Sequence, residues 1–331
     1  MMSAHSFRNF VAALDAEGSL IHLTRAVSPR YEIAALMKST NGRTPLIFEH
    51  VDGSDIPVIC GLGGSRELIA KNIGCAPRIL DRALAHAIAQ PILPVQIENA
   101  PVQERRINAP FELDAYMPML TFNELDVGPF LVSSMMIVRS EDGTKEYTSV
   151  RRMQYLGDNR LLVLITSREM QEQFRNFERR HEPLEVAFVL GITPATLLSS
   201  QISTHLYDCD KLSVAGGLMG EPMPLCHCLT VDIDVPAEAE IVLEGHVLGW
   251  EKETEGPFGE MGGYYGTLSK RPVVELTCMS SRQSPLAQVV FPSGFEEKLP
   301  MAVAREVGLL ATIRQTVPGV CQAYITPPTL G

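Results

Sequence analysis

Apolar side chains recur at helical spacing in the first part of the chain, and two compact apolar runs interrupt them. Phe7, Phe10, Val11 and Leu14 lie three or four positions apart, which predicts one face of an amphipathic helix near the N-terminus. The segments SRELIAKNIG and RILDRALAHAIAQ repeat this spacing, whereas PLIFEH and PVICGL have the composition of buried strands. This alternation predicts an N-terminal α/β domain over residues 1–108.

The start of a second helix is predicted from two adjacent residues. Ser28 and Pro29 are of the types preferred at the cap and at the first position of a helix. With that start, Ile33 and Leu36 would face inward.

Further along the chain the pattern changes to strands linked by turns. Six segments are rich in β-branched and apolar residues, namely FLVSSMMIVRS, RLLVLITS, LEVAFVLGI, LCHCLTVDIDV, AEIVLEGHVLGW and PVVELTCMS. Many strands with few helices between them predict a barrel or sandwich over residues 109–292. Helical spacing returns from Glu296 to Thr316, and AYITPPTLG has the pattern of a strand with its exit turn. Residues 293–331 are therefore expected to begin a third unit.

Charge and cysteine usage narrow the functional class. The 331 residues carry 28 basic and 39 acidic side chains, a formal net charge of −11, which argues against nucleic acid or an anionic membrane as partner. No apolar run approaches the ~20 residues that a membrane span needs. The seven cysteines are scattered and no secretory signal precedes them, so we expect a cytoplasmic protein.

The first candidate site is the segment EGPFGEMGGYYG. Glu255 and Glu260 flank a Gly-Pro-Phe-Gly turn, so both carboxylates can be directed at one point. Gly262 and Gly263 leave room for a flat ligand to approach the backbone. Paired carboxylates offer a proton donor and a group that tunes its pKa. A surface loop with two solvated acids is the alternative that the pattern leaves open.

The second candidate is the segment YTSVRRMQYLG. Arg151 and Arg152 are adjacent, so in a strand their side chains point to opposite faces. One of them could enter a cavity and bind a carboxylate with two hydrogen bonds. Two surface arginines are the alternative.

Two other motifs have simpler explanations. Cys226, His227 and Cys228 resemble a metal site, but in a strand the two thiols face one way and the imidazole the other, and no second pair lies at zinc spacing. GLGGS at residues 61–65 fits neither phosphate-loop pattern, so it is interpreted as a turn.

Together these segments resemble the UbiD family of reversible decarboxylases, which use prenylated flavin mononucleotide (FMN). FVAALDAEGSLIHLTRAVSPRYEIAAL, DVGPFLVSSMMIVRSEDG and VPAEAEIVLEGHV followed by EGPFGEMGGYYG are the similar segments. The resemblance runs along nearly the whole chain. It implies a fold of the α/β (α+β) class with an N-terminal α/β domain, a central split β-barrel of the flavin-reductase type, and the start of a C-terminal α/β domain. In the family that last domain is much longer.

The resemblance also implies roles for the charged residues. Glu260 would protonate the carbon that CO2 leaves, while Glu255 and Arg152 would hold the network and Arg152 would meet the substrate carboxylate. Arg152 matches the family better than Arg151, because Met153 and Gln154 follow it as the family pattern requires.

The implied cofactor is prenylated FMN, supplied by a flavin prenyltransferase. The implied substrate is an aromatic or α,β-unsaturated carboxylic acid, and a homo-oligomer is expected. The positions implied to contact the cofactor lie on either side of the catalytic residues: Thr148, Ser149, Val150, Arg151, Met153, Gln154, Pro257, Phe258 and Gly259.

One part of the family pattern is missing. Family members anchor the flavin phosphate through a divalent metal, Mn or Mg, held by Asn, His and Glu, and commonly bind K as well. The corresponding positions here are Tyr147, Leu164 and Pro224, so the resemblance implies no metal site of the usual type.

Two hypotheses follow. The protein is a working decarboxylase with altered phosphate anchoring, or it is a non-catalytic or accessory subunit of a multi-subunit carboxylase that does not bind the flavin. Retention of Arg152, Glu255 and Glu260 favours the enzyme, because a subunit without chemistry has little need of three coupled charges. A plain ligand-binding module is a further alternative, and flavin binding without CO2 exchange would indicate it.

Overall fold

The structure, a computed structural model, describes residues 6–204 and 206–326. Its α-helices are α1 (Phe7–Ala16), α2 (Glu32–Ser39), α3 (Arg66–Ile73), α4 (Leu80–Ala89), α5 (Arg168–Arg180), α6 (Pro194–Ser200), α7 (Lys211–Met219) and α8 (Phe295–Thr316). Short 3-10 helices are η1 (Pro77–Ile79), η2 (Pro101–Gln103) and η3 (Leu113–Ala115). The strands are β1 (Ile21–Val27), β2 (Leu46–Val51), β3 (Val58–Cys60), β4 (Val95–Gln96), β5 (Arg105–Asn108), β6 (Phe130–Arg139), β7 (Glu146–Gly157), β8 (Arg160–Val163), β9 (Leu184–Leu190), β10 (Pro224–His227), β11 (Asp234–Pro236), β12 (Ile241–Glu255), β13 (Ser269–Ser281) and β14 (Ala287–Gln288).

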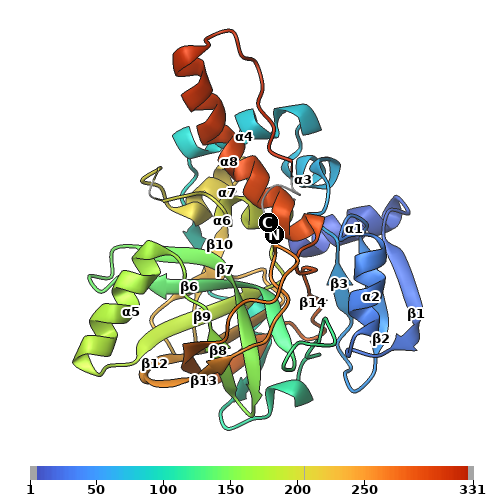
Figure 1. The fold of residues 1–331 in the computed structure, drawn as a ribbon, viewed down its shortest axis with the longest axis vertical. Coiled ribbons are helices and arrows are strands. Elements are labelled where there is room, and N and C mark those ends of the chain that lie inside the picture. Colours follow the sequence, from blue (N-terminus) through green and yellow to red (C-terminus); the bar gives the residue numbers. More distant parts are fainter. Residues whose placement is uncertain (1–5, 205, 327–331) are drawn as a thin grey trace.

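Among these described strands, six close into an antiparallel barrel in the lower half of Figure 1. Their order is β12-β9-β6-β7-β8-β13, and pairing of β12 with β13 completes the ring. Large apolar side chains such as Met136, Phe188 and Leu243 belong to its buried core. The predicted α/β fold with a central barrel is confirmed.

A smaller sheet stands beside the barrel, with strand order β1-β2-β3-β14. Helix α1 packs on it through the predicted apolar face, since Phe7, Phe10, Val11 and Leu14 are all buried. The Ser6 hydroxyl caps this helix by accepting a hydrogen bond from the Asn9 amide.

The expected domain boundaries at residues 108 and 292 stay predictions. Strand β5, at the end of the first expected domain, pairs with β13 of the barrel sheet. Strand β14 leaves the barrel region and pairs with β3 in the smaller sheet. At each of these two boundaries, a strand from one expected domain therefore pairs with a sheet of the other.

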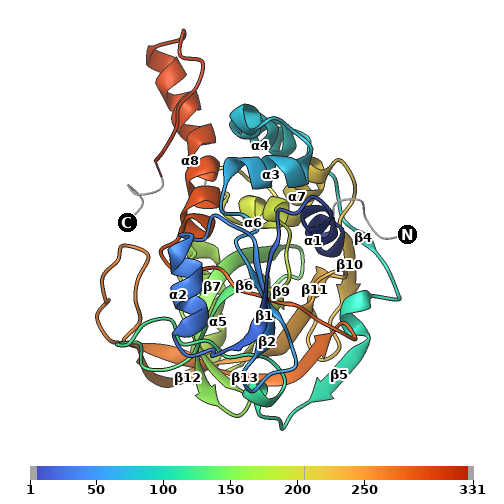
Figure 2. The same ribbon diagram turned by 90° about the vertical axis from the view of Figure 1, so that its right-hand side faces the viewer.

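A layer of helices lies over one end of the barrel (Figures 1 and 2), formed by α3, α4, α6, α7 and α8. Every residue of α6 is buried, as are all residues of α7 except Gly217. The patterns along the sequence predict neither helix, because a helix that is buried all round shows no contrast between two faces.

Two predicted elements are wrong in detail. The second helix begins at Glu32, not at Ser28-Pro29, because the Pro29 carbonyl and the Tyr31 amide bond instead to the backbone of Thr121. No strand forms over residues 323–326, and the rest of that expected strand and turn, PPTLG, lies outside the described residues.

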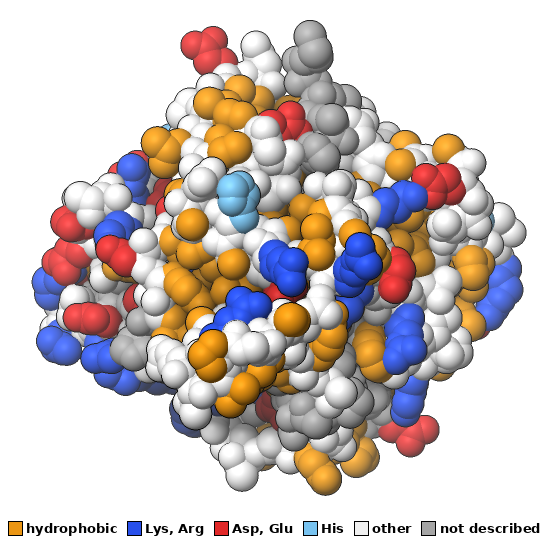
Figure 3. Space-filling model, turned by 90° about the horizontal axis from the view of Figure 1, so that it is seen from above, with side chains coloured by type: hydrophobic (Ala, Val, Ile, Leu, Met, Phe, Trp, Pro, Cys, Tyr) orange, Lys and Arg blue, Asp and Glu red, His pale blue; other side chains and the backbone are white. Residues whose placement is uncertain are grey.

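The surface and the cysteines do little to narrow the functional class of the protein. No described helix combines the length and apolar character that a membrane crossing requires. All seven thiols are free, and four of them are buried. On the face seen in Figure 3, Lys and Arg side chains are interspersed with acidic and apolar ones. The expected absence of a nucleic-acid partner and the cytoplasmic location stay predictions.

Candidate active site

Three charged side chains that are far apart in the sequence meet where β7 passes the end of β12. The guanidinium of Arg152 donates from Nε to Glu255 Oε1 at 2.9 Å and from Nη2 to Oε2 at 3.2 Å. Its Nη1 lies 2.5 Å from Glu260 Oε2. Glu255 is the last residue of β12 and Glu260 lies in the loop that follows. The structure therefore brings the three predicted catalytic residues into one network.

The network is graded from buried to accessible. The side chain of Glu255 is 3% exposed, that of Arg152 15% and that of Glu260 39%. Arg271 on β13 donates from Nε to Glu255 Oε2 at 3.0 Å, so the buried carboxylate is held by two arginines. Burial opposes the charge of Arg152, but the hydrogen bonds that it donates to Glu255 and Glu260 raise its pKa. Glu260 is thus the most exposed member of the network.

The loop between the two acids is fixed by backbone hydrogen bonds. The Gly256 amide donates to Gln154 Oε1 at 2.8 Å, and the Gly259 amide donates to Asp126 Oδ1 at 2.9 Å. Gly256 has φ +90°, a conformation that favours glycine. Between them Phe258 is buried, and Arg152 Cζ lies 5.0 Å from its ring centroid. The turn that the sequence analysis singled out therefore packs beneath the guanidinium.

The glycine beyond this loop makes room for Glu260. A Cβ added to Gly266 would lie 2.8 Å from Glu260 Oε1, closer than real contacts allow. The Glu260 amide also donates to the Tyr264 carbonyl at 2.8 Å. The placement of the accessible acid thus depends on the GGYYG segment.

A cavity of about 290 Å³ opens beside the network. Arg151, Arg152 and Glu260 lie on its wall together with Glu297 from α8. Burial raises the pKa of Glu297, whose carboxylate accepts a hydrogen bond from the Ser293 amide at 2.6 Å. The barrel forms one side of the cavity. The other side is formed by Val290 and Pro292 from the segment that leads into α8 and by Met301 of α8 itself.

A second cavity of about 650 Å³ follows further along β7. Its wall includes Tyr147, Thr148, Ser167 and Lys211. The two cavities share β7 and the segment after β8, since Leu164 and Thr166 line the first and Ser167 and Glu169 line the second. An elongated ligand could therefore follow β7 from one cavity to the other.

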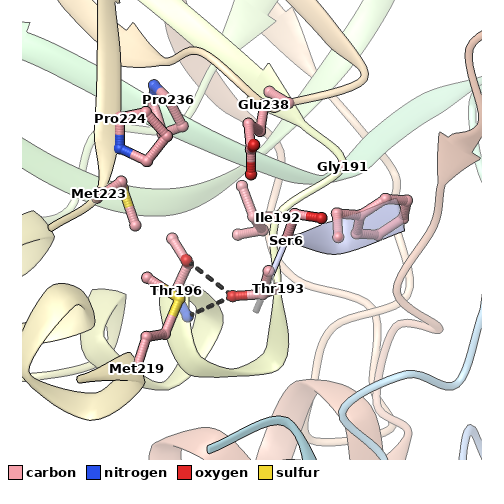
Figure 4. Close-up of a pocket in the computed structure, with 12 residues that line it drawn as sticks. Ser6, Gly191, Ile192, Thr193, Thr196, Met219, Met223, Pro224, Pro236 and Glu238 are labelled. Carbon is pink, nitrogen blue, oxygen red and sulfur yellow. Dashed lines mark hydrogen bonds between the residues drawn. The ribbon is translucent and has the colours of Figure 1, made fainter. Parts of the chain in front are cut away.

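A third cavity, shown in Figure 4, is much smaller at about 40 Å³. Thr193 and Thr196 hydrogen-bond to each other in it, and Met219, Met223 and Pro236 give it apolar walls. It holds none of the predicted catalytic residues. We do not assign it a role in the chemistry.

The expected cofactor positions fall into two groups. Val150, Arg151 and Phe258 line the smaller of the β7 cavities and Thr148 lines the larger. The others do not line either cavity: Met153 is buried in the barrel core, Gln154 holds the Gly256 amide, and Ser149, Pro257 and Gly259 stand beside them on β7 and the loop. Their contact with a cofactor stays a prediction.

The residues present fit a flavin better than they fit a metal. Three donors buried near or in the β7 cavities, Thr148 Oγ1, Arg151 Nε and Ser167 Oγ, lack hydrogen-bond partners among the described residues. A ligand rich in acceptor oxygens would satisfy them.

The three family metal positions lie on different cavities. Tyr147 lines the cavity of about 650 Å³, Leu164 that of about 290 Å³ and Pro224 that of about 40 Å³ shown in Figure 4. In the described part of the chain, no group of three or more His, Cys, Asp or Glu side chains is placed to hold a metal ion. The expectation that no metal site of the usual type is present stays a prediction.

The three residues of the Cys-His-Cys motif do not converge on one point as metal ligands would. Cys226 and Cys228 are buried, and the His227 ring is exposed and bonds to Asp234 Oδ1 at 3.0 Å. The loop at residues 61–65 is a turn whose amides bond to Glu296, as described below.

Sequence reasoning missed Arg271, Glu297 and Lys211. Arg271 pairs with the buried carboxylate, Glu297 faces the cavity from α8, and Lys211 is buried at the start of α7. The only local signal was the pair of acids at the start of α8, Glu296 and Glu297. Nothing in the sequence pattern relates Arg271 or Lys211 to the charged network, because their contacts depend on tertiary structure.

Comparison with protein families and known proteins identifies the group to which this architecture belongs. Residues 94–295 match the model of the 3-octaprenyl-4-hydroxybenzoate carboxy-lyase Rift-related domain, and residues 11–88 match that of the N-terminal domain of the same enzymes. A curated relative, anhydromevalonate phosphate decarboxylase from Methanothermobacter thermautotrophicus, is 30% identical over 319 residues, which span 96% of this chain and 73% of that protein.

Solved structures have the same fold. An evolved dimeric form of the UbiD-class enzyme HmfF from Pelotomaculum thermopropionicum, in complex with prFMN, matches with a TM-score of 0.94 and 39% identity, over 98% of this chain and 76% of that one. Vanillic acid decarboxylase from Sedimentibacter hydroxybenzoicus matches with a TM-score of 0.88 and 24% identity, over 97% of this chain and 71% of that one, and shows the fold alone. By its family models, its curated relative and its fold, the chain belongs to the UbiD family of decarboxylases.

Proposed function

We propose that the protein decarboxylates an aromatic or α,β-unsaturated carboxylic acid with prenylated FMN as cofactor and Glu260 as proton donor. The observation that carries the proposal is Arg152, which bonds at once to buried Glu255 and to accessible Glu260 at the wall of a cavity. The reaction can run in reverse, because the same groups would then remove the proton and accept CO2.

Arg152 binds the substrate and Glu255 holds Arg152 in place. Two hydrogen bonds to a carboxylate that is 3% exposed fix the plane of the guanidinium. A substrate carboxylate that enters the cavity meets this fixed cation near Glu260. Arg271 donates to the same carboxylate from the other side and helps to hold it in place.

Glu260 moves the proton. When the bond between the substrate carbon and its carboxyl carbon breaks, CO2 leaves and the electron pair stays behind on the substrate carbon. The protonated carboxyl of Glu260 gives its proton to that carbon, and the resulting carboxylate is stabilised by Arg152 Nη1 until solvent restores the proton. Its partial exposure supports this role, since a proton donor that turns over must exchange with water.

Prenylated FMN, when bound, supplies the electron sink for the bond that breaks. Val150 and Phe258 would line the ring end and Thr148 the other end, because they belong to the walls of the two β7 cavities. Arg151 would act between them, since it lines the smaller cavity and its charge acts on Lys211 of the larger one. A flavin prenyltransferase would supply the cofactor. We also propose a homo-oligomer, supported by the dimeric form of the HmfF relative.

The experiment compares CO2 release by flavin-loaded wild type, Glu260→Gln and Glu253→Gln on a panel of aromatic and unsaturated acids. Loss of general-acid catalysis lowers turnover by about 10²-fold or more, so Glu260→Gln should release almost no CO2 while it keeps its flavin. Because Glu260 is partly exposed, its replacement should change the free energy of unfolding by less than about 0.5 kcal/mol.

Glu253→Gln is the matched control. Glu253 lies on β12 two residues before Glu255 and pairs with Arg160, which keeps Glu251 as a second partner. Its turnover should equal that of the wild type. Unchanged CO2 release by Glu260→Gln would exclude the proposed proton donor. No release from any flavin-loaded form would instead support the accessory subunit.

A further inference from the structure

The start of α7 buries a lysine whose ammonium has no anionic hydrogen-bond partner among the described residues. Lys211 is 9% exposed, and its Nζ donates to the Thr148 carbonyl at 2.9 Å and to the Ser200 carbonyl at 2.8 Å. An ammonium has three N–H donors, so one remains for another acceptor. Two neutral carbonyls do not neutralise a buried cation, which is costly unless an anion accompanies it.

The acids near Lys211 are engaged elsewhere. Asp210 caps α7 by accepting from the Leu212 and Ser213 amides. Glu169 attracts the lysine at longer range, and its Oε1 accepts from the Thr204 hydroxyl at 2.7 Å. Burial and the charge of Arg151 lower the pKa of Lys211 to about 8. The net environment therefore leaves the ammonium short of negative charge.

Arg151 is in the same condition. It lines the smaller β7 cavity, its Nε is buried without a partner, and it makes no ion pair among the described residues. Burial lowers its pKa to about 10. An unpaired guanidinium at a cavity wall is the group that binds phosphate through two parallel hydrogen bonds.

Two hydroxyl groups complete the donor set. Thr148 Oγ1 and Ser167 Oγ are buried without partners and belong to residues on the wall of the larger cavity, as Lys211 does. Thr148 precedes Arg152 by four positions on β7, a span of about 13 Å at roughly 3.3 Å per residue. A flavin with its ring beside Arg152 would extend its ribityl chain in this direction and carry its phosphate toward these donors.

From these contacts we infer that the flavin phosphate is held by Lys211 and Arg151, with Thr148 and Ser167 as neutral donors, and that no divalent metal takes part. The inference rests on the proposed function in that it takes a flavin as the ligand. The side-chain cations supply the charge that a metal would bring, at positions where the family's metal ligands are replaced by Tyr147, Leu164 and Pro224.

The test is equilibrium binding of FMN and of riboflavin to the full apo chain in the presence of a chelator, followed by flavin fluorescence. Riboflavin has the same ring and ribityl chain but no phosphate, so the ratio of the two affinities isolates the phosphate. We expect FMN to bind at least about tenfold more tightly than riboflavin, and the chelator to change its Kd less than about twofold. Lys211→Met and Arg151→Met should each weaken FMN about tenfold or more and leave riboflavin unchanged.

Lys145→Met is the matched control, since Lys145 lines the same cavity but is exposed and pairs with Asp208. It should bind both flavins as the wild type does. If Lys211→Met does not fold, Lys211→Arg and Arg151→Met still decide, because Arg keeps the charge and the Arg151 side chain makes no hydrogen bond to α7 among the described residues. Equal loss of FMN and riboflavin in the variants would mean a structural role only. FMN binding that the chelator abolishes and Mn²⁺ or Mg²⁺ restores would overturn the inference.

The outcome is separable from that of the proposed function. FMN binding of the predicted kind without CO2 release by the prenylated form would overturn the function and leave the inference standing. CO2 release that requires added metal would support the proposed function and overturn the inference about the phosphate.

Discussion

Arg152 shows how single residues acquire their roles in this site. Its neighbour Arg151 has the same chemistry and lies on the same strand, but only Arg152 bonds to two carboxylates. The difference arises from the alternation of side chains along β7, which directs one arginine to the end of β12 and leaves the other unpaired. Position on a strand, and not residue type, therefore separates the catalytic cation from the one that we assign to phosphate.

The contact between Gly266 and Glu260 gives a test at this scale. An added Cβ would displace the flexible end of Glu260, so Gly266→Ala should lower turnover about tenfold or more with little loss of stability. Gly128→Ala is the control, because a Cβ there meets nothing within 4 Å. Turnover and thermal unfolding of both variants check this. Full activity in Gly266→Ala would show that Glu260 does not need its observed position.

The three charged residues could be predicted from the sequence because they lie in short local motifs. Glu255 and Glu260 flank one turn, and Arg152 is followed by Met153 and Gln154. The residues that surround them could not be predicted in this way. Glu297 and Arg271 reach the network from α8 and β13, and burial of Lys211 depends on contacts with β7 and α6.

Helix α8 shows how elements are held in place around the cavity. Two buried acids anchor it. Glu296 accepts from the Gly61 and Gly63 amides at 2.7 and 3.0 Å, and Glu306 pairs with Arg66 at 2.5 Å. The backbone amides of the turn after β3 thus bind the carboxyl group of Glu296. Glu297 follows Glu296 directly in the chain. The hydrogen bonds of Glu296 therefore also fix the position of Glu297 on the cavity wall.

This anchor should make stability depend on pH. Burial raises the pKa of Glu296 from 4.5 to about 7, so the native state binds its proton more tightly than the unfolded chain. The resulting stabilisation is complete below pH 4.5 and is lost as the pH rises through 7. Relative to Glu296→Gln, the wild type should lose roughly 2–4 kcal/mol of unfolding free energy between pH 4.5 and 8.

Denaturant unfolding at several pH values measures this loss. Glu67→Gln is the control, since Glu67 is an exposed acid on neighbouring α3 and should leave the wild-type pH profile intact. Parallel profiles for the wild type and Glu296→Gln would show that Glu296 stays ionised in the native state.

Elements were predictable where one face is buried and the other is not. Helix α1 shows that contrast, whereas the barrel strands β6 and β9 are buried on both faces and were located by their β-branched and apolar composition. Helices α6 and α7 are buried almost throughout and show none. The false start at Ser28-Pro29 has another cause: a bridge to Thr121 takes the backbone groups that the first turn would use.

At the scale of the whole molecule, the barrel and the helical layer place the cavity between parts of the chain that are distant in sequence. Strand β7 crosses from the acids at the end of β12 to the lysine at the start of α7. The proposed catalytic groups lie at one end of this path, Lys211, Thr148 and Ser167 lie at the other, and Arg151 lies between them. The central claim is that a flavin occupies the path and that the chain works as a decarboxylase.

Native mass spectrometry of protein purified with a chelator from cells that overproduce prenylated FMN tests this claim most directly, together with the absorbance spectrum and CO2 release of the same sample. We predict one prenylated flavin per chain, no bound divalent metal, and CO2 release from an aromatic or unsaturated acid. A colourless protein with the bare mass of the chain would contradict the account.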